Sequence, residues 1–262
     1  MLVEDDPLHE RCFAPKWRQV SQTSDKVPQA SVRDPEKVRA MFGRIAHKYD
    51  LANHVLSLGS DFFWRARVAG IVEIWQARRI LDLATGSGDL ALAMQQKLPD
   101  AEITAADFSP EMLALASSKG VKNTILADAL ALPFSDASFD CVTVGFGLRN
   151  MADWSAALRE MSRVIHSNGH LLILDFSLPS PPLRFVYRAY LHKVLPHVAA
   201  LLTGQRDAYD YLGGSIEAFP IGDEMLRLIE SCGFRNASAY PVTAGVATIY
   251  VAERSTEPTP RL

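Results

Sequence analysis

The segment ILDLATGSGDLALAM, residues 80–94, constrains the possible folds of this chain more than any other. Its first five residues are typical of a buried strand, and the run from residue 89 onward is typical of a helix. Small residues form the turn between them, namely Thr85, Gly86, Ser87 and Gly88. Glycines in such a turn let the backbone approach a ligand closely. The segment therefore predicts the first strand and helix of an α/β domain whose ligand lies beyond the carboxyl end of that strand.

Short apolar runs alternate with amphipathic stretches along the rest of the chain, which is typical of βα units over a mostly parallel sheet. The expected strands are 79–84, 102–106, 123–127, 139–145, 170–176, 237–240 and 247–252. The expected helices are 89–97, 110–118, 154–165 and 223–232, with Ser109 and Gly233 as caps. Because only the turn 243–245 separates the last two strands, we expect them to form an antiparallel hairpin at the edge of the sheet.

One large α/β domain, residues 34–254, accounts for most of the 262 residues. Residues 34–78 precede the first strand and are expected to form a helical cap. Residues 177–221 are expected to form an insertion that covers the site as a lid. Residues 1–33 and 255–262 mix Pro, Ser and charged residues without a clear apolar period, so we expect them to be a poorly ordered extension and tail.

Composition argues against several classes of protein. A net charge of −3 shows no basic character of the kind that nucleic-acid-binding proteins usually carry. The sequence has no run of about 18 uncharged apolar residues that could span a membrane, and its acidic start is unlike a secretory signal. The expected location is therefore the cytoplasm. Three widely separated cysteines without a CxxC pair predict no metal site and no disulfide framework.

Three acidic residues follow one another at the ends of successive expected strands. Asp82 can meet the cationic amino-acid end of S-adenosylmethionine through water or an amide, whereas a carboxylate there would be poorly placed beside a pyrophosphate. Asp107, followed by Phe108, can bind ribose hydroxyls, and Asp128, followed by Ala129, can accept a hydrogen bond from the adenine amino group. Taken singly, Asp107 and Asp128 could also be helix caps or solvated strand ends. The ordered set predicts a site for S-adenosylmethionine.

Beyond this site, the chain resembles the quinone-biosynthesis C-methyltransferases (the UbiE/MenG family) over about residues 35–252. The resemblance rests on the glycine turn and on five further motifs: VRAMFGRIAHKYDLANHVLSLGSDFFWR, DFSPEML, DALALPFSDASFD, GFGLRNMADWSAALREMSRVIHSNGHLLILDFS and AYDYLGGSIEAFP. It implies a class I S-adenosylmethionine-dependent methyltransferase with a Rossmann-like sheet of seven mostly parallel strands. It also implies C-methylation of a polyprenylated quinol precursor, with demethylmenaquinol as the expected substrate.

The resemblance also implies roles for single residues. It puts cofactor contacts on Ser87, Asp107, Asp128 and Ala129, and a further contact at Gly145. The chain departs from the family where Thr85 replaces a frequent Gly, where Gly145 replaces a frequent Ser, and where Tyr250 replaces a frequent His. Loss of the Ser hydroxyl puts the contact at Gly145 in doubt.

Transfer of a methyl group to carbon requires an electron-rich ring, so some group must hold the phenolate that forms or carry its proton. Arg149 and Asn150 follow the fourth expected strand and are the candidates beside the methyl group. Guanidinium is always protonated, so Arg149 would act by charge, with water as the proton carrier. Tyr49 and Asp50 of the KYD motif are expected to close over the cofactor. The alternatives are a helix-flanking ion pair for Arg149 and a packing role for Tyr49.

The insertion contains an aromatic and basic stretch, residues 183–202, interrupted by Pro196. Such a stretch can form a helical lid with an apolar face toward a prenyl chain and a basic face toward lipid headgroups. A helix that simply packs over the sheet is the equal alternative. The first interpretation adds a peripheral contact with the inner face of the membrane.

Two other functions compete with methyl transfer. A dinucleotide-dependent oxidoreductase would have a cleaner GxGxxG turn, and Asp128 would be superfluous in it. A scaffold of a quinone-biosynthetic assembly that binds the cofactor without turnover is the non-enzymatic alternative. No residue separates a menaquinone from a ubiquinone precursor, and the preference for the former comes from the family. The prenyl length and an oligomeric state stay open.

Overall fold

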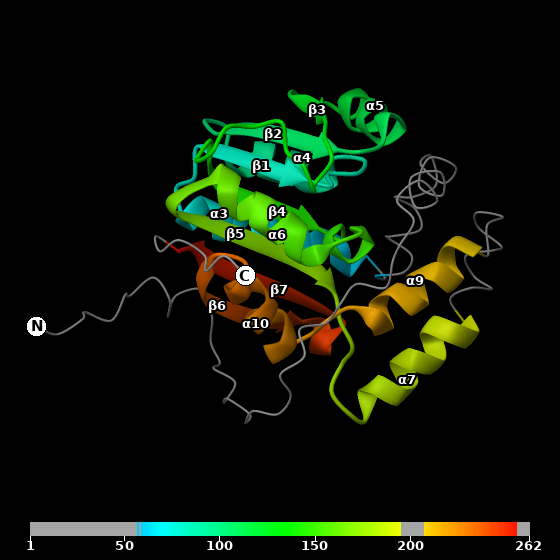
Figure 1. The fold of residues 1–262 in the computed structure, drawn as a ribbon. Coiled ribbons are helices and arrows are strands. Elements are labelled where there is room, and N and C mark those ends of the chain that lie inside the picture. Colours follow the sequence, from blue (N-terminus) through cyan, green and yellow to red (C-terminus); the bar gives the residue numbers. More distant parts are fainter. Residues whose placement is uncertain (1–56, 58, 195–206, 256–262) are drawn as a thin grey trace, which may run out of the picture.

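A computed structural model of the chain describes residues 57, 59–194 and 207–255 (Figure 1). These residues form a seven-stranded sheet in the order β3-β2-β1-β4-β5-β7-β6. Every strand runs parallel to its neighbours except β7, which is antiparallel to both β5 and β6. The strands are β1 (Arg79–Leu83), β2 (Glu102–Asp107), β3 (Thr124–Leu126), β4 (Phe139–Gly145), β5 (Ile165–Phe176), β6 (Phe234–Val242) and β7 (Ala247–Arg254).

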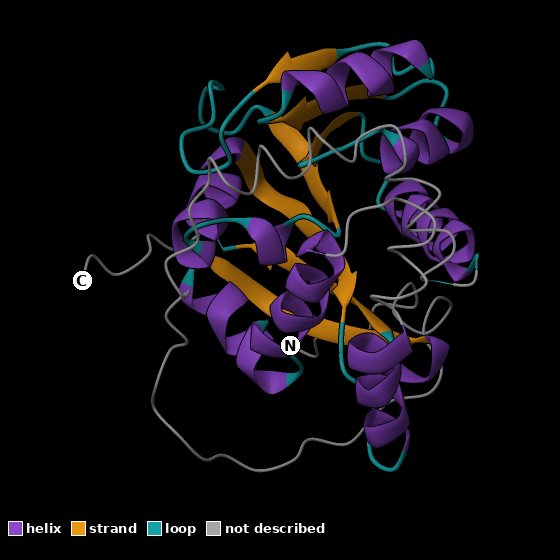
Figure 2. Ribbon diagram, turned by 90° about the vertical axis from the view of Figure 1, so that its right-hand side faces the viewer, coloured by secondary structure: helices purple, strands orange, loops and turns teal. Residues whose placement is uncertain are grey.

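Helices cover both faces of this sheet (Figure 2). One face packs against α3 (Ser60–Ile74), α4 (Asp89–Lys97) and α5 (Pro110–Ser118). The other face packs against α6 (Trp154–Val164) and α10 (Asp223–Ser231). Each face of the sheet has its own hydrophobic core. Side chains alternate between the two faces along β1, so Ile80 lies in the first core, whereas Leu81 and Leu83 lie in the second. By the same alternation Asp82 faces α3 and α4.

Within the expected cap of residues 34–78, the described residues form helix α3. Its Trp64 is fully buried, and the indole lies 6.0 Å from the ring of Phe146 and 6.1 Å from that of Phe176, measured between ring centroids. The indole N–H also donates to the hydroxyl of Thr243 over 2.8 Å. These contacts hold α3 against the carboxyl ends of β4 and β5.

The predicted order of strands and helices is confirmed, with two larger corrections at the boundaries. Strand β5 begins at Ile165 instead of residue 170, because Ile165 pairs with Phe139 directly after α6 ends. Strand β6 spans 234–242 instead of 237–240. The last two strands form the expected antiparallel hairpin at one edge of the sheet, with β7 pairing to β5 and with β6 as the outer strand.

The two predicted caps are present. The Ser109 hydroxyl accepts a hydrogen bond from the amide of Met112, at 3.3 Å, directly before α5. Gly233 follows α10 with φ = 95°, a left-handed conformation that glycine adopts without strain. The start of α5 and the end of α10 could therefore be predicted from local residue chemistry.

The insertion after β5 forms α7 (Leu183–Ala189), a π-helical turn η2 (Tyr190–Val194) and α9 (Asp207–Ala218), which lie beyond the carboxyl ends of the parallel strands (Figure 1). Glu217 of α9 pairs with Arg188 at 2.6 Å and with His192 at 3.2 Å. Arg188 of α7 is therefore paired with α9, although half of its side chain stays exposed. Pro196 lies outside the described residues.

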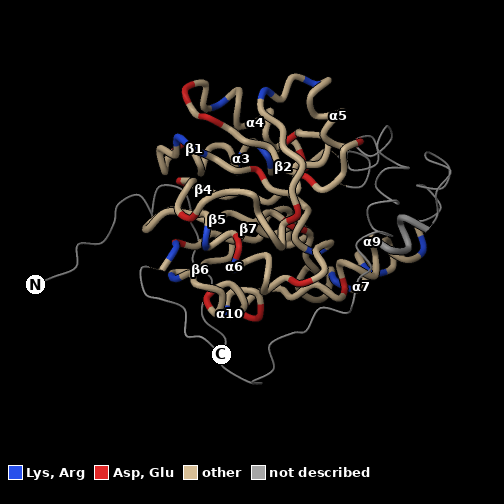
Figure 3. The backbone as a smooth tube through the Cα atoms, turned by 45° about the horizontal axis from the view of Figure 1, so that its top comes forward, with Lys and Arg blue, Asp and Glu red and all other residues tan. Residues whose placement is uncertain are grey.

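In the part of the chain that the structure describes, no helix combines the length and the apolar character needed to cross a lipid bilayer. The same residues contain no cluster of His, Cys, Asp and Glu that could bind a metal ion. Figure 3 shows Lys and Arg interspersed with Asp and Glu over the described elements, with an acidic first turn on α10 formed by Asp223 and Glu224.

Candidate functional site

The glycine turn connects the carboxyl end of β1 to α4 in a backbone conformation that few residue types tolerate. Ala84, Gly86 and Gly88 all have positive φ, at 53°, 56° and 85°. The amide of Gly86 donates to Oδ2 of Asp107 over 2.8 Å, so the turn is bound to the end of β2. The predicted turn at the carboxyl edge of the sheet is thus present, and β2 holds it in place.

Gly88 has a packing role that the sequence did not reveal. A Cβ atom at this position would lie 2.5 Å from Cγ2 of Val121 and 2.9 Å from Cβ of Ala116. Its missing side chain therefore lets α4 pack against the end of α5. The glycine is required because of this contact and because of its positive φ.

Asp82 is fully buried, and both of its oxygens accept hydrogen bonds from hydroxyl groups. Thr85 donates to Oδ2 over 2.6 Å, and Thr143 of β4 donates to Oδ1 over 2.8 Å. Burial raises the pKa of Asp82 to about 6, with a further contribution from the nearby carboxylate of Asp107, and the two hydroxyls oppose the shift. Because Thr85 is only partly buried, Asp82 can reach a ligand through the Thr85 hydroxyl.

Asp107 is the carboxylate around which the site is organised. Its Oδ2 accepts from the amide of Gly86, and its Oδ1 accepts from the amide of Ser109 over 2.9 Å. Burial raises the pKa of Asp107, and these amides oppose the shift because they stabilise the charged form. Each oxygen of a carboxylate has a second lone pair, so Asp107 can still accept two hydroxyl hydrogens from a ribose.

Asp128 lies at the same edge of the sheet as Asp107. The amide of Ala127 donates to the backbone oxygen of Asp107 over 2.9 Å, which holds the end of β3 beside the end of β2. The Asp128 side chain is exposed, and its Oδ1 accepts from the amide of Leu130 over 2.9 Å. Phe108 and Ala129, the residues that follow the two carboxylates, are each half-buried.

The remaining predicted cofactor positions are packed against the protein itself. Ser87 is buried. A Cβ atom at Gly145 would lie 3.1 Å from Leu90 of α4, so a serine there would have to displace that side chain. Gly147 was not predicted, yet a Cβ atom there would lie 2.5 Å from Cβ of Ala84. The segment after β4 therefore lies directly on the glycine turn.

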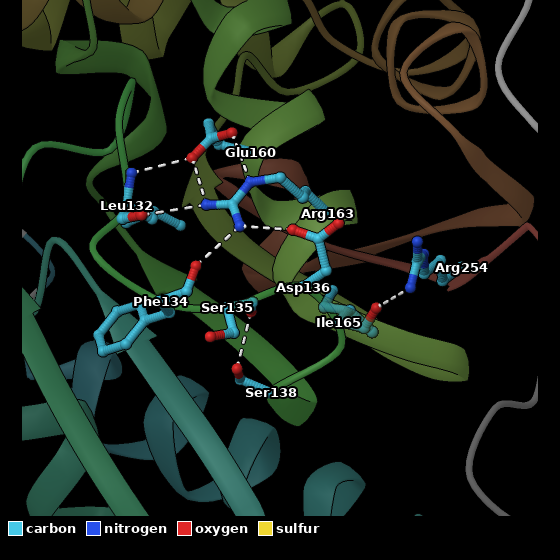
Figure 4. A network of polar contacts seen from close by, with 9 residues as sticks. All are labelled: Leu132, Phe134, Ser135, Asp136, Ser138, Glu160, Arg163, Ile165 and Arg254. Atoms are coloured by element: carbon cyan, nitrogen blue, oxygen red, sulfur yellow. Dashed lines mark hydrogen bonds and ion pairs between the residues drawn. The ribbon is translucent and has the colours of Figure 1, made fainter.

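Arg163 of α6 stabilises the loop that follows Asp128 (Figure 4). Its guanidinium donates to the backbone oxygens of Leu132 and Phe134 over 3.0 and 2.7 Å, and to Oδ1 of Asp136 over 2.8 Å. Glu160, one turn earlier, binds Arg163 and also accepts from the amide of Leu132 over 2.9 Å. The pair thus attaches the whole loop to α6.

We expect Arg163→Gln to lower the free energy of unfolding by about 1–3 kcal/mol, because two backbone oxygens of the loop lose a charged donor. Amide hydrogen exchange should show the loss of protection first in residues 128–138. Arg159→Gln is the matched control, since Arg159 is an exposed arginine on the same helix. Equal exchange in the two variants would contradict this role.

Arg149 and Asn150 lie in the 3-10 turn η1 (Leu148–Asn150), directly after β4. Arg149 is buried, and its Nη1 donates over 2.6 Å both to Oδ1 of Asp175 and to the backbone oxygen of Phe146. The guanidinium carbon lies 5.3 Å from the centroid of the Phe176 ring. Burial raises the pKa of Tyr187 of α7, and the charge of Arg149 opposes that shift. Helix α9 of the insertion contacts this turn.

Reasoning from the sequence missed two residues of this region, Thr143 and Asp175. Both lie within apolar strands, where a single polar residue among buried neighbours was the available signal.

Tyr49 and Asp50 lie outside the described residues. Tyr250, the third departure from the family, is buried in the core beside α6 and α10, where its hydroxyl accepts from the amide of Gly222 over 3.3 Å.

Comparison with known proteins adds to this geometry. Residues 30–254 match the ubiE/COQ5 methyltransferase family. The chain is 45% identical over 222 residues to a demethylmenaquinone methyltransferase of Thermus thermophilus, and this match covers 82% of the chain and 100% of the relative. It is 38% identical over 228 residues to a ubiquinone/menaquinone biosynthesis C-methyltransferase of Geotalea uraniireducens, covering 84% and 97%.

A solved structure with a similar fold is an S-adenosylmethionine-dependent methyltransferase of Thermotoga maritima, described as a possible histamine N-methyltransferase. The TM-score is 0.59 at 16% identity, and the match covers 82% of this chain and 99% of that one. At such low identity the likeness concerns the fold alone. It confirms the predicted Rossmann-like architecture with mostly parallel strands.

Proposed function

Because the chain belongs to the ubiE/COQ5 methyltransferase family, we propose that it transfers a methyl group from S-adenosylmethionine to a ring carbon of demethylmenaquinol. The observation that carries the proposal is the match to a demethylmenaquinone methyltransferase along that relative's whole length. A ubiquinone precursor is the second candidate, because the relative from Geotalea is named for both pathways.

The residues at the carboxyl edge of the sheet suit S-adenosylmethionine in their donor and acceptor chemistry. We assign the ribose hydroxyls to Asp107, whose two oxygens keep acceptor capacity beyond the amides that they already bind. We assign the adenine amino group to the exposed carboxylate of Asp128. The cationic amino group would lie toward Thr85, whose hydroxyl relays the negative charge of Asp82. When bound, the sulfonium supplies a methyl group that is already activated.

The pH should control this binding through Asp82. Its pKa of about 6 means that the carboxylate is protonated below that pH and charged above it. Cofactor affinity should therefore be full above pH 6 and should fall as the pH drops through 6, by about tenfold if binding lowers the pKa by one unit. Titration calorimetry between pH 5 and 7 measures this, and Asp82→Asn should flatten the profile. Equal affinity at both ends for the unaltered protein would contradict the assignment.

The titration of Asp82 changes the stability of the folded protein in the direction opposite to its effect on cofactor affinity. The folded-state pKa of Asp82 is raised above its ordinary value of 3.8, so the folded protein binds the proton more tightly than the unfolded chain. The resulting stabilisation is complete at low pH and is lost as the pH rises toward about 6. As the pH rises toward about 6, cofactor affinity should increase while stability decreases. A loss of affinity at low pH therefore cannot be caused by unfolding through Asp82.

For the ring chemistry, we assign Arg149 and Asn150 to the side of the site where the quinol lies. The guanidinium can hold the phenolate that forms when the hydroquinol loses its proton, and water can carry that proton away. Aligning the ring carbon with the methyl group can contribute roughly 7–11 kcal/mol in favourable cases. Tyr49 and Asp50 stay in the proposal as residues that close over the cofactor.

We further assign the insertion to the prenyl chain and to the surface of the membrane that holds it. The observation that supports this is the outward direction of two large apolar side chains on α7, Phe185 and Val186, which are 71% and 66% exposed. Lys193, in the following turn, is also exposed and can contact anionic headgroups.

The decisive experiment supplies methyl-labelled S-adenosylmethionine together with a demethylated menaquinol or a demethylated ubiquinol precursor under reducing conditions. We expect the label in the menaquinol. Label only in the ubiquinol precursor would select the second candidate. Cofactor binding without label in either product would favour the non-catalytic scaffold.

A further inference from the structure

The turn that carries Arg149 and Asn150 is bound to a carboxylate on the neighbouring strand. Asp175 lies near the carboxyl end of β5 and is fully buried. Its Oδ1 accepts from Nη1 of Arg149 over 2.6 Å, and its Oδ2 accepts from the amide of Arg149 over 3.4 Å. One side chain thus holds both the backbone and the guanidinium of the same arginine.

The contacts around this pair leave the turn little freedom. The backbone oxygen of Phe146 accepts from Nη1 of Arg149 over 2.6 Å and from the side-chain amide of Asn150 over 3.3 Å. Phe146 itself has φ = 58°, and its amide donates to Leu174 of β5 over 2.7 Å. Because Nη1 binds both Asp175 and Phe146, these two partners set the position and the plane of the guanidinium.

Oδ1 of Asp175 also accepts a hydrogen bond from the amide of Phe176 over 2.9 Å. That bond fixes the carboxylate on its own strand, while the Phe176 ring lies beneath the guanidinium. A buried guanidinium without a counter-charge is strongly unfavourable. The carboxylate therefore makes it possible for Arg149 to occupy a dry position beside the site, and also fixes its direction.

We propose that Asp175 is a positioning residue for methyl transfer, acting through Arg149 and Asn150 without touching either substrate. This rests on the function proposed above. A displacement of about 1 Å in a group beside the reacting atoms can cost about a hundredfold in rate. Removal of the Asp175 charge should therefore lower kcat while leaving the cofactor contacts of β1, β2 and β3 intact.

The test compares three variants in the quinol methylation assay. Asp175→Asn should lower kcat by about 10- to 100-fold, with the dissociation constant for S-adenosylmethionine changed by less than about threefold. Asp175→Glu keeps the carboxylate and should recover much of the lost kcat, although its extra methylene disturbs the packing as well. Asp140→Asn is the control, because Asp140 also binds two backbone amides and an arginine, at the opposite end of β4.

A double-variant cycle distinguishes positioning from a purely structural role. If Asp175 acts through Arg149, Asp175→Asn should lower kcat little further once Arg149→Lys is present. Independent, multiplicative losses would overturn the proposal, as would a full kcat in Asp175→Asn or in Arg149→Lys. An unaltered protein that labels neither quinol would overturn the proposed function itself, and this inference with it.

Discussion

Asp107→Asn is expected to weaken the binding of S-adenosylmethionine by about 10- to 150-fold. Hydrogen bonds to a charged group contribute about 1.5–3 kcal/mol, and 1.4 kcal/mol corresponds to a factor of ten in affinity. The amide nitrogen of the new side chain would also face the backbone N–H of Gly86 or of Ser109, both of which now donate to Asp107. Titration calorimetry at pH 7 measures the loss.

Two comparisons make this prediction specific. Asp100→Asn alters an exposed carboxylate in the turn before β2, at the opposite edge of the sheet, and should leave the affinity unchanged. Asp128→Asn removes a single assigned contact at an exposed position and should weaken binding less than Asp107→Asn does. A thermal unfolding curve shows whether Asp107→Asn remains folded. A folded variant with affinity within twofold of the original would refute the assignment of the ribose to Asp107.

Gly88→Ala should lower the free energy of unfolding by about 2–5 kcal/mol. A left-handed backbone costs a residue with a Cβ atom about 1–2 kcal/mol, and overpacking of a close contact costs about 1–3 kcal/mol. Both apply here, because φ is 85° and the new methyl group would lie 2.5 Å from Val121. Chemical denaturation measured by circular dichroism gives the change directly.

The matched control is Gly70→Ala in α3, where a Cβ atom meets nothing within 4 Å and helix propensity favours alanine by about 1 kcal/mol. This control should be neutral or slightly stabilising. Val121→Ala should offset part of the loss when combined with Gly88→Ala, because it removes the nearer of the two clashing groups. A strictly additive double variant would show that the contact with Val121 is not the cause.

The elements were predictable wherever local chemistry decides them. The strand and helix around the glycine turn follow from residue pattern alone, and the caps at Ser109 and Gly233 follow from side-chain chemistry and backbone freedom. Boundaries were less predictable. Residues 165–169 look polar, yet β5 begins at Ile165 because the neighbouring strand offers Phe139 as a partner. No local pattern contains that information.

The candidate site, too, was predictable only in part. Asp82, Asp107 and Asp128 were predictable because each stands near the end of an apolar strand, and parallel strands end at one edge of a sheet. What these side chains bind was not predictable. Asp82 accepts a hydrogen bond from Thr143, which lies 61 positions away in the chain. Arg149 is held by Asp175, 26 positions away.

The order of strands and helices, the glycine turn after β1 and the edge of the sheet at which the acidic residues gather could all be read from the chain, because they depend on neighbours along it. The position of β7 between β5 and β6, the packing of α4 on α5 at Gly88 and the pairing of Arg149 within the protein became visible only in the folded chain. Each of those outcomes depends on which distant side chains fill the space around a residue. Close packing sets that environment across the whole domain.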